Sequence, residues 1–98
     1  MRKLNEKEIE TALKDLSGWK NENNSLVKSF KTLGFPQTMA LSSAICGFCQ
    51  QHDHHPDYLT MKYSEIIVSF STHSEGGITD KDINIAKEID SLKKGLTK

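Results

Sequence analysis

Two runs of alternating apolar and polar residues stand on either side of a short polar connection, and they constrain the fold more than any other feature of the sequence. This alternation is typical of β-strands with one buried face. A two-residue turn at Ser64 and Glu65 would join the runs into an antiparallel hairpin. The resulting cross-strand pairs are Tyr63 with Ile66, Met61 with Val68, Leu59 with Phe70 and Tyr58 with Ser71. Because each apolar residue then meets an apolar partner, we predict this register.

The histidines of the chain gather at the open end of this hairpin. Three of the four precede the first strand, as His52, His54 and His55. The fourth, His73, follows the second strand, and the register brings it opposite Pro56. A slip of one residue would turn His73 to the other face of the sheet. The hydrophobic pattern therefore predicts a cluster of His54, His55 and His73.

Three amphipathic helices are predicted in the rest of the chain. The first begins at Asn5, where a glutamate three positions later completes a capping box, and it ends before Gly18. The second follows Pro36. The third begins at Thr79, an N-cap whose third helical residue is Asp82. The apolar stripes are Ile9, Ala12, Leu13 and Leu16 in the first helix, Leu41, Ala44, Ile45, Phe48 and Cys49 in the second, and Ile85, Ile89, Leu92 and Leu96 in the third.

A second hairpin between the first two helices completes the predicted fold. Turn-forming residues 21–25 separate a short arm, 19–20, from a longer arm, 26–32. The order of elements is αββαββα. We expect one domain, residues 1–98, folded as an α+β two-layer sandwich with a four-stranded antiparallel sheet and three helices on one face. The other face of the sheet is largely polar and would be open to self-association or to a ligand.

Composition argues against several classes of partner. Thirteen basic and thirteen acidic residues cancel in a chain of 98, so nothing favours nucleic acid or an anionic membrane. The N-terminus lacks the apolar segment of a signal peptide, and no run approaches the roughly 20 apolar residues that span a bilayer. We expect a soluble, cytoplasmic protein. A domain this small buries a modest share of its surface, so association with copies of itself would be a natural supplement.

Cys46 and Cys49 raise two further possibilities, a metal site and a redox pair. With two of the histidines they could form a Cys2His2 zinc site, but both fall inside a predicted helix, whereas structural zinc usually takes such a pair from a tight turn. A thioredoxin-like pair would open a helix instead of interrupting one. We therefore expect small buried cysteines and no metal. We also expect His52 to be a solvated residue at the end of its helix.

Two interpretations of the histidine cluster are compatible with the residue types. Like-charge repulsion would hold at least one of several close imidazoles neutral near pH 7 and leave another available as the protonated partner. Such a set can give and take protons at one pH, as general acid and base catalysis requires. Pro56 would support it rigidly, because proline fixes its own φ and biases His55 toward an extended conformation. The alternative is a polar loop without a catalytic role.

The run "HHPDYLTMKY", followed by "STH" and "TDKDINIA", resembles the pterin-4a-carbinolamine dehydratase family. The resemblance also covers Gly18-Trp19 and the region of Gly34-Phe35, and so nearly the whole chain. The ordered motif consists of His54-His55-Pro56, an aromatic residue at Tyr63, then His73 and Asp82. A spaced set of this kind is far more specific than an isolated His-His-Pro.

The resemblance implies an α+β sandwich found as homodimers or homotetramers. It implies dehydration of the 4a-hydroxytetrahydropterin that aromatic amino acid hydroxylases release, without a metal, nucleotide or flavin. Carried over by motif, the catalytic and pterin-binding histidines would be His54, His55 and His73, and the other lining residues would be Pro56, Thr72, Ser74 and Glu75. Of the histidines, we expect His55 to be the main acid and base and the other two to position or stabilise.

The sequence leaves open the roles of three residues and a second possible function. Asp82 belongs to the motif, but its helix-capping role is our preferred interpretation. Trp19 could be a core residue or a wall of the pterin pocket. Gln50 occupies a position that is often acidic in the family, and it cannot hold a charge near a histidine. Because family members also serve as dimerisation partners of a transcription regulator, a non-catalytic binding module is the alternative function.

Overall fold

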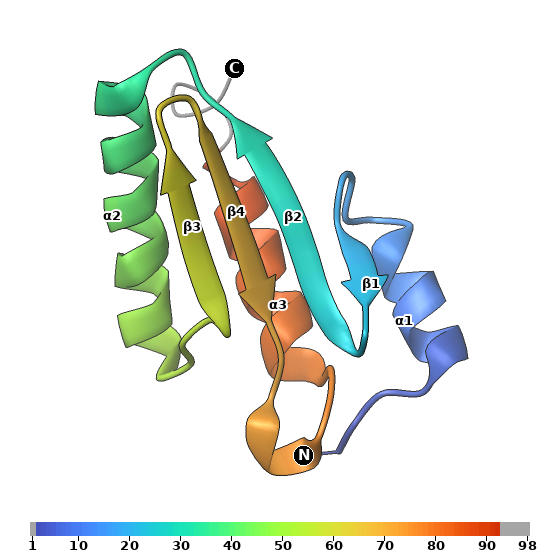
Figure 1. The fold of residues 1–98 in the computed structure, drawn as a ribbon. Helices are drawn as coiled ribbons and strands as arrows, with labels where there is room; N and C mark the ends of the chain where they lie inside the picture. The colour runs from blue at the N-terminus through green and yellow to red at the C-terminus, as the bar shows by residue number, and fades with distance from the viewer. Residues whose placement is uncertain (1, 93–98) are drawn as a thin grey trace.

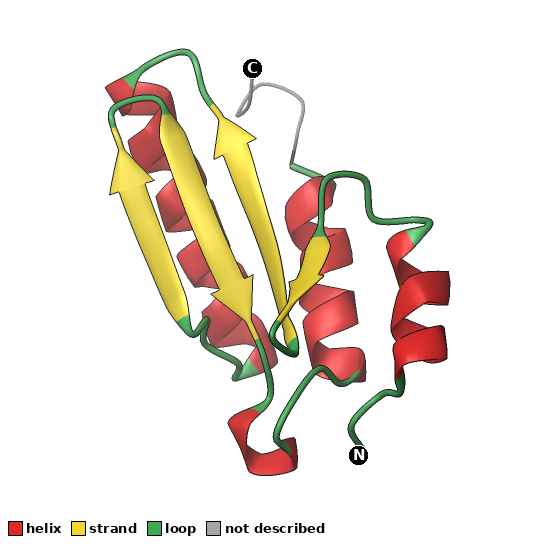
Figure 2. Ribbon diagram, turned by 45° about the vertical axis from the view of Figure 1, so that its right-hand side comes forward, coloured by secondary structure: helices red, strands yellow, loops and turns green. Residues whose placement is uncertain are grey.

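The computed structural model describes residues 2–92 and confirms the predicted α+β architecture. The elements are α1 (Glu6–Leu13), β1 (Lys20–Glu22), β2 (Ser25–Lys31), α2 (Phe35–His52), β3 (Tyr58–Lys62), β4 (Glu65–Phe70), the 3-10 turn η1 (His73–Glu75) and α3 (Asp80–Asp90). The strands form one antiparallel sheet in the order β1-β2-β4-β3. The helices lie on one side of this sheet (Figures 1 and 2).

Both predicted capping boxes are present and explain where α1 and α3 begin. In α1, the Asn5 side chain accepts a hydrogen bond from the backbone N–H of Glu8, whose carboxylate accepts one from the backbone N–H of Asn5. Thr79 and Asp82 form the equivalent pair at α3. Helix α1 ends at Leu13, earlier than predicted, and Gly18 then has the positive φ of 86° that favours glycine. Leu96, the last residue of the predicted third stripe, lies outside the described residues.

The first hairpin contains a buried charge that disturbs its alternation. Lys28 is only 8% exposed, between Leu26 and Phe30 on the core face of β2. Its ammonium group donates to the Asp90 carboxylate at 2.9 Å and to the Ser17 carbonyl oxygen at 2.8 Å. It also lies 4.6 Å from the centre of the Phe30 ring. These partners let a lysine occupy a core position, so the weak strand pattern has a physical cause.

The register predicted for the second hairpin is wrong by two residues. The observed pairs are Lys62 with Glu65, Met61 with Ile66, Leu59 with Val68 and Tyr58 with Ser69, and the connecting turn is formed by residues 63 and 64. Tyr63 leaves the ladder, is 72% exposed, and stacks on Phe35 at a centroid distance of 6.4 Å. Because the side-chain period is two, the predicted faces survive this shift. The predicted pairing of His73 with Pro56 does not, because His73 lies in η1, beyond the end of β4.

Trp19 is a core residue. Its ring contacts Phe30 and Phe70 at centroid distances of 6.0 and 6.4 Å. Its indole N–H donates to the Asp90 carboxylate at 3.0 Å, which satisfies the one polar group of this buried side chain. Asp90 therefore ties α3 to the segment after α1 through Trp19 and to β2 through Lys28.

Candidate active site

The first motif histidine, His54, is fixed by the sharp turn that ends α2. Asp53 caps the helix in the left-handed region at φ 50°, and the backbone N–H of His54 donates to the Cys49 carbonyl oxygen at 3.0 Å. The imidazole stacks on Phe70 at a centroid distance of 6.0 Å. Its Nε2 lies 2.5 Å from Oδ1 of Asp82. With a side chain only 9% exposed, His54 has a fixed position.

Asp82 is both a helix cap and the partner of His54. Its carboxylate is fully buried. Oδ2 accepts from the backbone N–H of Thr79 and from the hydroxyl of Thr72, both at 2.9 Å, while Oδ1 faces His54. Because an ionised carboxylate only accepts hydrogen bonds, Nε2 of His54 carries the hydrogen of this contact. Nδ1 is the ring nitrogen that takes no part in the contact with Asp82. The capping interpretation of Asp82 is correct but incomplete.

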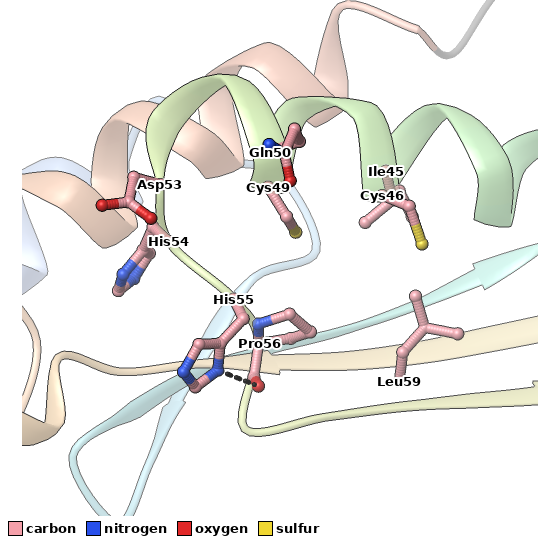
Figure 3. A pocket seen from close by; sticks show the side chains of 9 residues that line it. All are labelled: Ile45, Cys46, Cys49, Gln50, Asp53, His54, His55, Pro56 and Leu59. Carbon is pink, nitrogen blue, oxygen red and sulfur yellow. Dashed lines mark hydrogen bonds between the residues drawn. The ribbon is translucent and has the colours of Figure 1, made fainter.

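The other two motif histidines lie close together near the start of β3. Nδ1 of His55 lies 3.1 Å from the Pro56 carbonyl oxygen, which can only accept, so the hydrogen is on Nδ1 and Nε2 is left free of this bond (Figure 3). The ring centroids of His55 and His73 are 6.4 Å apart, and the interplanar angle is 74°. Nε2 of His73 lies 2.6 Å from Oδ1 of Asp57. The predicted proximity of His55 and His73 is therefore present, although it does not come from strand pairing.

A cavity of about 450 Å³ opens between the C-terminal half of α2 and β3. Its lining residues are Ile45, Cys46, Cys49, Gln50, Asp53, His54, His55, Pro56 and Leu59 (Figure 3). His54, His55 and Pro56 of the predicted set therefore share this cavity with Gln50. Leu59 and Ile45 supply apolar surface, so the cavity has the mixed character of a small-molecule site.

The predicted residues after β4 lie elsewhere. Thr72 is buried, with its hydroxyl turned to Asp82 and to the Thr79 hydroxyl. Ser74 and Glu75 are exposed residues of η1. His73 borders a second hollow of about 330 Å³, whose other lining residues are Asn23, Asn24, Ser25, Ser71, Gly76 and Gly77. The structure thus brings His55 and His73 together and links Thr72 to His54 through Asp82, but the Thr72–Glu75 segment does not line the cavity that His54, His55 and Pro56 share.

The cysteines and His52 differ from their predicted states. Cys46 is exposed instead of buried, and Cys49 is partly buried; both are free thiols that face the cavity. Burial, and secondly the Cys46 thiol, raises the pKa of Cys49 to about 11.

The expectation of a solvated His52 is wrong, because its partly buried ring has Nε2 2.9 Å from the Glu88 carboxylate. Within residues 2–92, no three His, Cys, Asp or Glu side chains are grouped so that they could hold a metal ion.

Asp57 is the site residue that the sequence analysis missed. It directly follows Pro56, and its carboxylate holds His73. Two signals in the sequence could have found it: its place beside the His-His-Pro motif, and the serines at Ser69 and Ser71 on the neighbouring strand end, which can donate to a carboxylate on the same face.

None of the helices in the described part of the chain has the length and apolar character needed to cross a membrane.

The fold and these histidines define a class of protein: a small α+β sandwich with paired histidines beside the β3–β4 hairpin. The family model described as pterin 4 alpha carbinolamine dehydratase matches residues 2–92. The chain therefore belongs to the pterin-4a-carbinolamine dehydratase family. The resemblance drawn from the sequence is confirmed at this level.

Individual relatives agree with this assignment. A protein of Sulfolobus acidocaldarius named "Putative pterin-4-alpha-carbinolamine dehydratase" is 41% identical over 92% of this chain and 98% of its own length. A protein of the same name from Aquifex aeolicus is 37% identical over 100% of this chain and 98% of its own. The crystal structure of a transcriptional coactivator/pterin dehydratase from Brucella melitensis superposes with a TM-score of 0.88 at 29% identity, over 92% of this chain and 97% of that one.

A more distant structure shares the fold alone. It is a pterin dehydratase-like protein identified as a RuBisCO assembly factor in the alpha-carboxysome, with a TM-score of 0.65 at 16% identity. The match covers 78% of this chain and 87% of that one. One fold therefore serves proteins with different described roles, and function has to be argued from the site.

Proposed function

We propose that this protein catalyses the dehydration of 4a-hydroxytetrahydropterin to quinonoid dihydropterin and water, as part of pterin recycling for aromatic amino acid hydroxylation. The observation that carries the proposal is the state of the histidine rings. In each of His54, His55 and His73 one ring nitrogen faces a group that only accepts hydrogen bonds, so the protonation of that nitrogen is fixed and the other nitrogen can exchange a proton.

The reaction needs one proton removed and one supplied. The N5–H proton of the substrate leaves to a base, the N5 electron pair forms the new double bond to C4a, and the C4a–O bond breaks as the hydroxyl is protonated and departs as water. No atom is oxidised or reduced, so histidine general acid and base catalysis is sufficient and the reaction needs no cofactor. We assign the main acid and base role to His55, whose Nε2 is free of the bond to Pro56.

The other predicted residues take supporting roles in this proposal. His54, held by Asp82, would position the pterin or stabilise charge in the cavity that it shares with His55 and Pro56. His73 would act from the side of η1, together with Ser74 and Glu75 as substrate contacts. Thr72 would contribute indirectly, because its hydroxyl supports Asp82. A cavity of about 450 Å³ is adequate for a bicyclic ring system.

We also propose that the protein works as a cytoplasmic homodimer or homotetramer. Large apolar side chains are exposed around the start of α2 and the turn between β3 and β4: they are Leu33, Phe35, Met39 and Tyr63. Exposed apolar groups of this kind commonly mark protein interfaces. The same surface supports the second candidate function, a non-catalytic dimerisation or coactivator-type module, because it could receive a different protein instead of a second copy.

A stopped-flow assay of 4a-hydroxytetrahydropterin dehydration tests the proposal. We expect the wild-type protein to accelerate the reaction over its spontaneous rate, equally with and without a metal chelator. A folded protein that gives no acceleration between pH 5 and 9 would contradict the dehydratase proposal and favour the binding module. Loss of activity on adding chelator would contradict the metal-free mechanism.

A further inference from the structure

The carboxylate of Asp57 collects four hydrogen bonds at the edge of the candidate site. Oδ2 accepts from the hydroxyls of Ser25 at 3.1 Å and Ser69 at 3.0 Å. Oδ1 accepts from the Ser71 hydroxyl at 2.7 Å and faces Nε2 of His73 at 2.6 Å. A carboxylate offers about four lone-pair positions, so this one is fully used.

The three serines fix the carboxylate independently of the histidine. Ser25 begins β2, Ser69 belongs to β4, and Ser71 follows β4, so the donors come from two strands next to each other in the sheet. The backbone N–H of Asp57 also donates to the Ser69 carbonyl oxygen at 2.6 Å. The side chain of Asp57 is 19% exposed. His73 therefore meets an acceptor whose position is already determined by the sheet.

His73 needs such an acceptor, because its own surroundings hold it weakly. Its side chain is 71% exposed and it stands in a 3-10 turn of three residues. With Nε2 donating to Asp57, Nδ1 becomes the nitrogen that can exchange a proton. His55 has the opposite arrangement, with Nδ1 donating to Pro56. The two neighbouring rings thus offer different nitrogens to whatever lies near them.

Stability alone is a poor explanation for the contact with His73. An ion pair with an exposed partner contributes little to folding, because solvent screens it and the side chain loses entropy. The serines already satisfy three of the four acceptor positions of Asp57. What the histidine gains is a fixed direction and a defined donor nitrogen. This is the role that an orienting carboxylate has beside a catalytic imidazole.

We propose that Asp57 is a positioning residue, which orients the His73 ring and fixes its donor nitrogen for the dehydration reaction. This inference rests on the proposed function. It is supported by the charge of Asp57: burial alone would raise the pKa of its carboxyl, but the hydrogen bonds from Ser71, His73, Ser69 and Ser25 outweigh burial and hold that pKa below its usual range. The Asp57 carboxylate therefore stays ionised over the pH range in which imidazoles gain and lose protons. The titratable groups on its open side are His73 and His55.

The orientation is tested by NMR in the absence of any substrate. In wild type we expect nuclear Overhauser contacts between the ring protons of His55 and His73, and a hydrogen-bonded Nε2–H signal from His73. Asp57→Ala should lose both. Glu65→Gln is the matched control, because Glu65 is also a carboxylate on this sheet, accepting from Ser29 and Lys31 at the far end of β4, and the variant should keep both signals.

The catalytic part is tested by kinetics on the same variants. Carboxylates that orient metal-bound histidines contribute about 10- to 100-fold. By analogy we expect kcat of Asp57→Ala to fall by about tenfold or more, with KM nearly unchanged. The kcat of Asp57→Asn should fall less, because asparagine keeps the size of the side chain and one acceptor oxygen. Asp57→Glu should retain part of the kcat that Asp57→Ala loses. Glu65→Gln should match wild type.

The outcomes separate the inference from the proposed function. Unchanged ring contacts in a folded Asp57→Ala protein would overturn the positioning role, whatever the activity. Lost ring contacts with undiminished kcat would show that the orientation has no catalytic use, and would also overturn it. If wild type has no dehydratase activity but the ring contacts depend on Asp57, the orientation stands and the proposed function fails.

Discussion

Two histidine–aspartate pairs in this protein have nearly the same geometry and opposite surroundings. His54 and Asp82 are buried, with Nε2 and Oδ1 separated by 2.5 Å. His73 and Asp57 lie 2.6 Å apart in a pair that is mostly exposed on the histidine side. Asp82 belongs to the capping box of α3, whereas Asp57 is held by serines of the sheet. The His54–Asp82 pair is therefore part of the buried structure, whereas the His73–Asp57 pair lies at the surface.

This difference has a practical consequence for interpreting mutations. A change at Asp82 leaves several buried donors without a partner, so loss of activity cannot be separated from loss of structure. A change at Asp57 leaves fewer buried donors without a partner, because His73 is exposed and, of the three serines, only Ser69 is buried. The exposed pair is therefore the better place to measure how a carboxylate influences a histidine in this site.

The largest expected effect is on stability. Asp82→Ala should lower the free energy of unfolding by about 3 kcal/mol or more, because it breaks a buried pair and a helix cap together. Asp57→Ala should cost only about 1 kcal/mol, the scale of ordinary hydrogen bonds. Urea denaturation at pH 7 measures both, with exposed Asp80→Asn on the same helix as a control expected within about 0.5 kcal/mol of wild type. Equal losses for Asp82 and Asp57 would break the distinction between the pairs.

The two cysteines extend the comparison of buried and exposed groups to the cavity itself. With the pKa of Cys49 raised to about 11, its thiolate fraction at pH 7 is about a hundredfold below that of an ordinary cysteine. A thiol reagent should therefore modify exposed Cys46 first and leave Cys49 almost untouched. Peptide mapping after brief alkylation checks this, and Cys46→Ser should remove the fast phase. Equal labelling of both residues would contradict the burial of Cys49.

A second carboxylate placed in the cavity, in addition to Asp53, would test how a charge there affects the histidines. Gln50 lines the cavity with His54 and His55, and Asp53 and the two cysteines are its other titratable lining groups. In Gln50→Glu, a negative charge would favour imidazolium and move the acid limb of the pH–rate profile up by about one unit. Gln50→Asn is the neutral control and should keep the wild-type profile. Unchanged profiles in both variants would show that this position does not influence the histidines.

The smallest expected effect is the loss of stability at low pH. Because the pKa of Asp57 is lowered in the folded protein, its contribution to stability is complete above the unfolded carboxyl pKa of about 3.9 and is lost as the pH falls through the lower folded value. Wild type and Asp57→Asn should therefore differ in stability at pH 7 and converge in acid. Thermal unfolding at a series of pH values measures the difference. A gap that persists below the folded pKa would assign the effect to packing.

The sequence predicted local features well and long-range geometry less well. Capping residues such as Asn5 and Thr79, and the alternation of strand faces, act over a few residues and were recognised correctly. The register of β3 and β4 was wrong because Tyr63 looks like a strand residue but stacks on Phe35, from another element. Lys28 similarly occupies a core position that only its contact with Asp90 permits.

The candidate site shows the same division. The motif singled out His54, His55, His73 and Asp82 as candidates, but its spacing did not show which carboxylate each histidine contacts. Asp82 lies 28 positions from His54 and meets it only because the end of α2 and the start of α3 are adjacent in space. Asp57 lies 16 positions from His73 and meets it because the chain bends into η1 after β4. Such partners depend on tertiary packing.

The proposed role of His55 as acid and base can be tested in a single kinetic experiment. Stopped-flow dehydration of 4a-hydroxytetrahydropterin should be compared for wild type, His55→Ala and His52→Ala. His52 is the matched control, since its ring pairs with Glu88 outside the cavity. We predict a loss of at least about a hundredfold for His55→Ala and near wild-type rates for His52→Ala. A folded His55→Ala protein that retains the wild-type rate would rule out this role for His55.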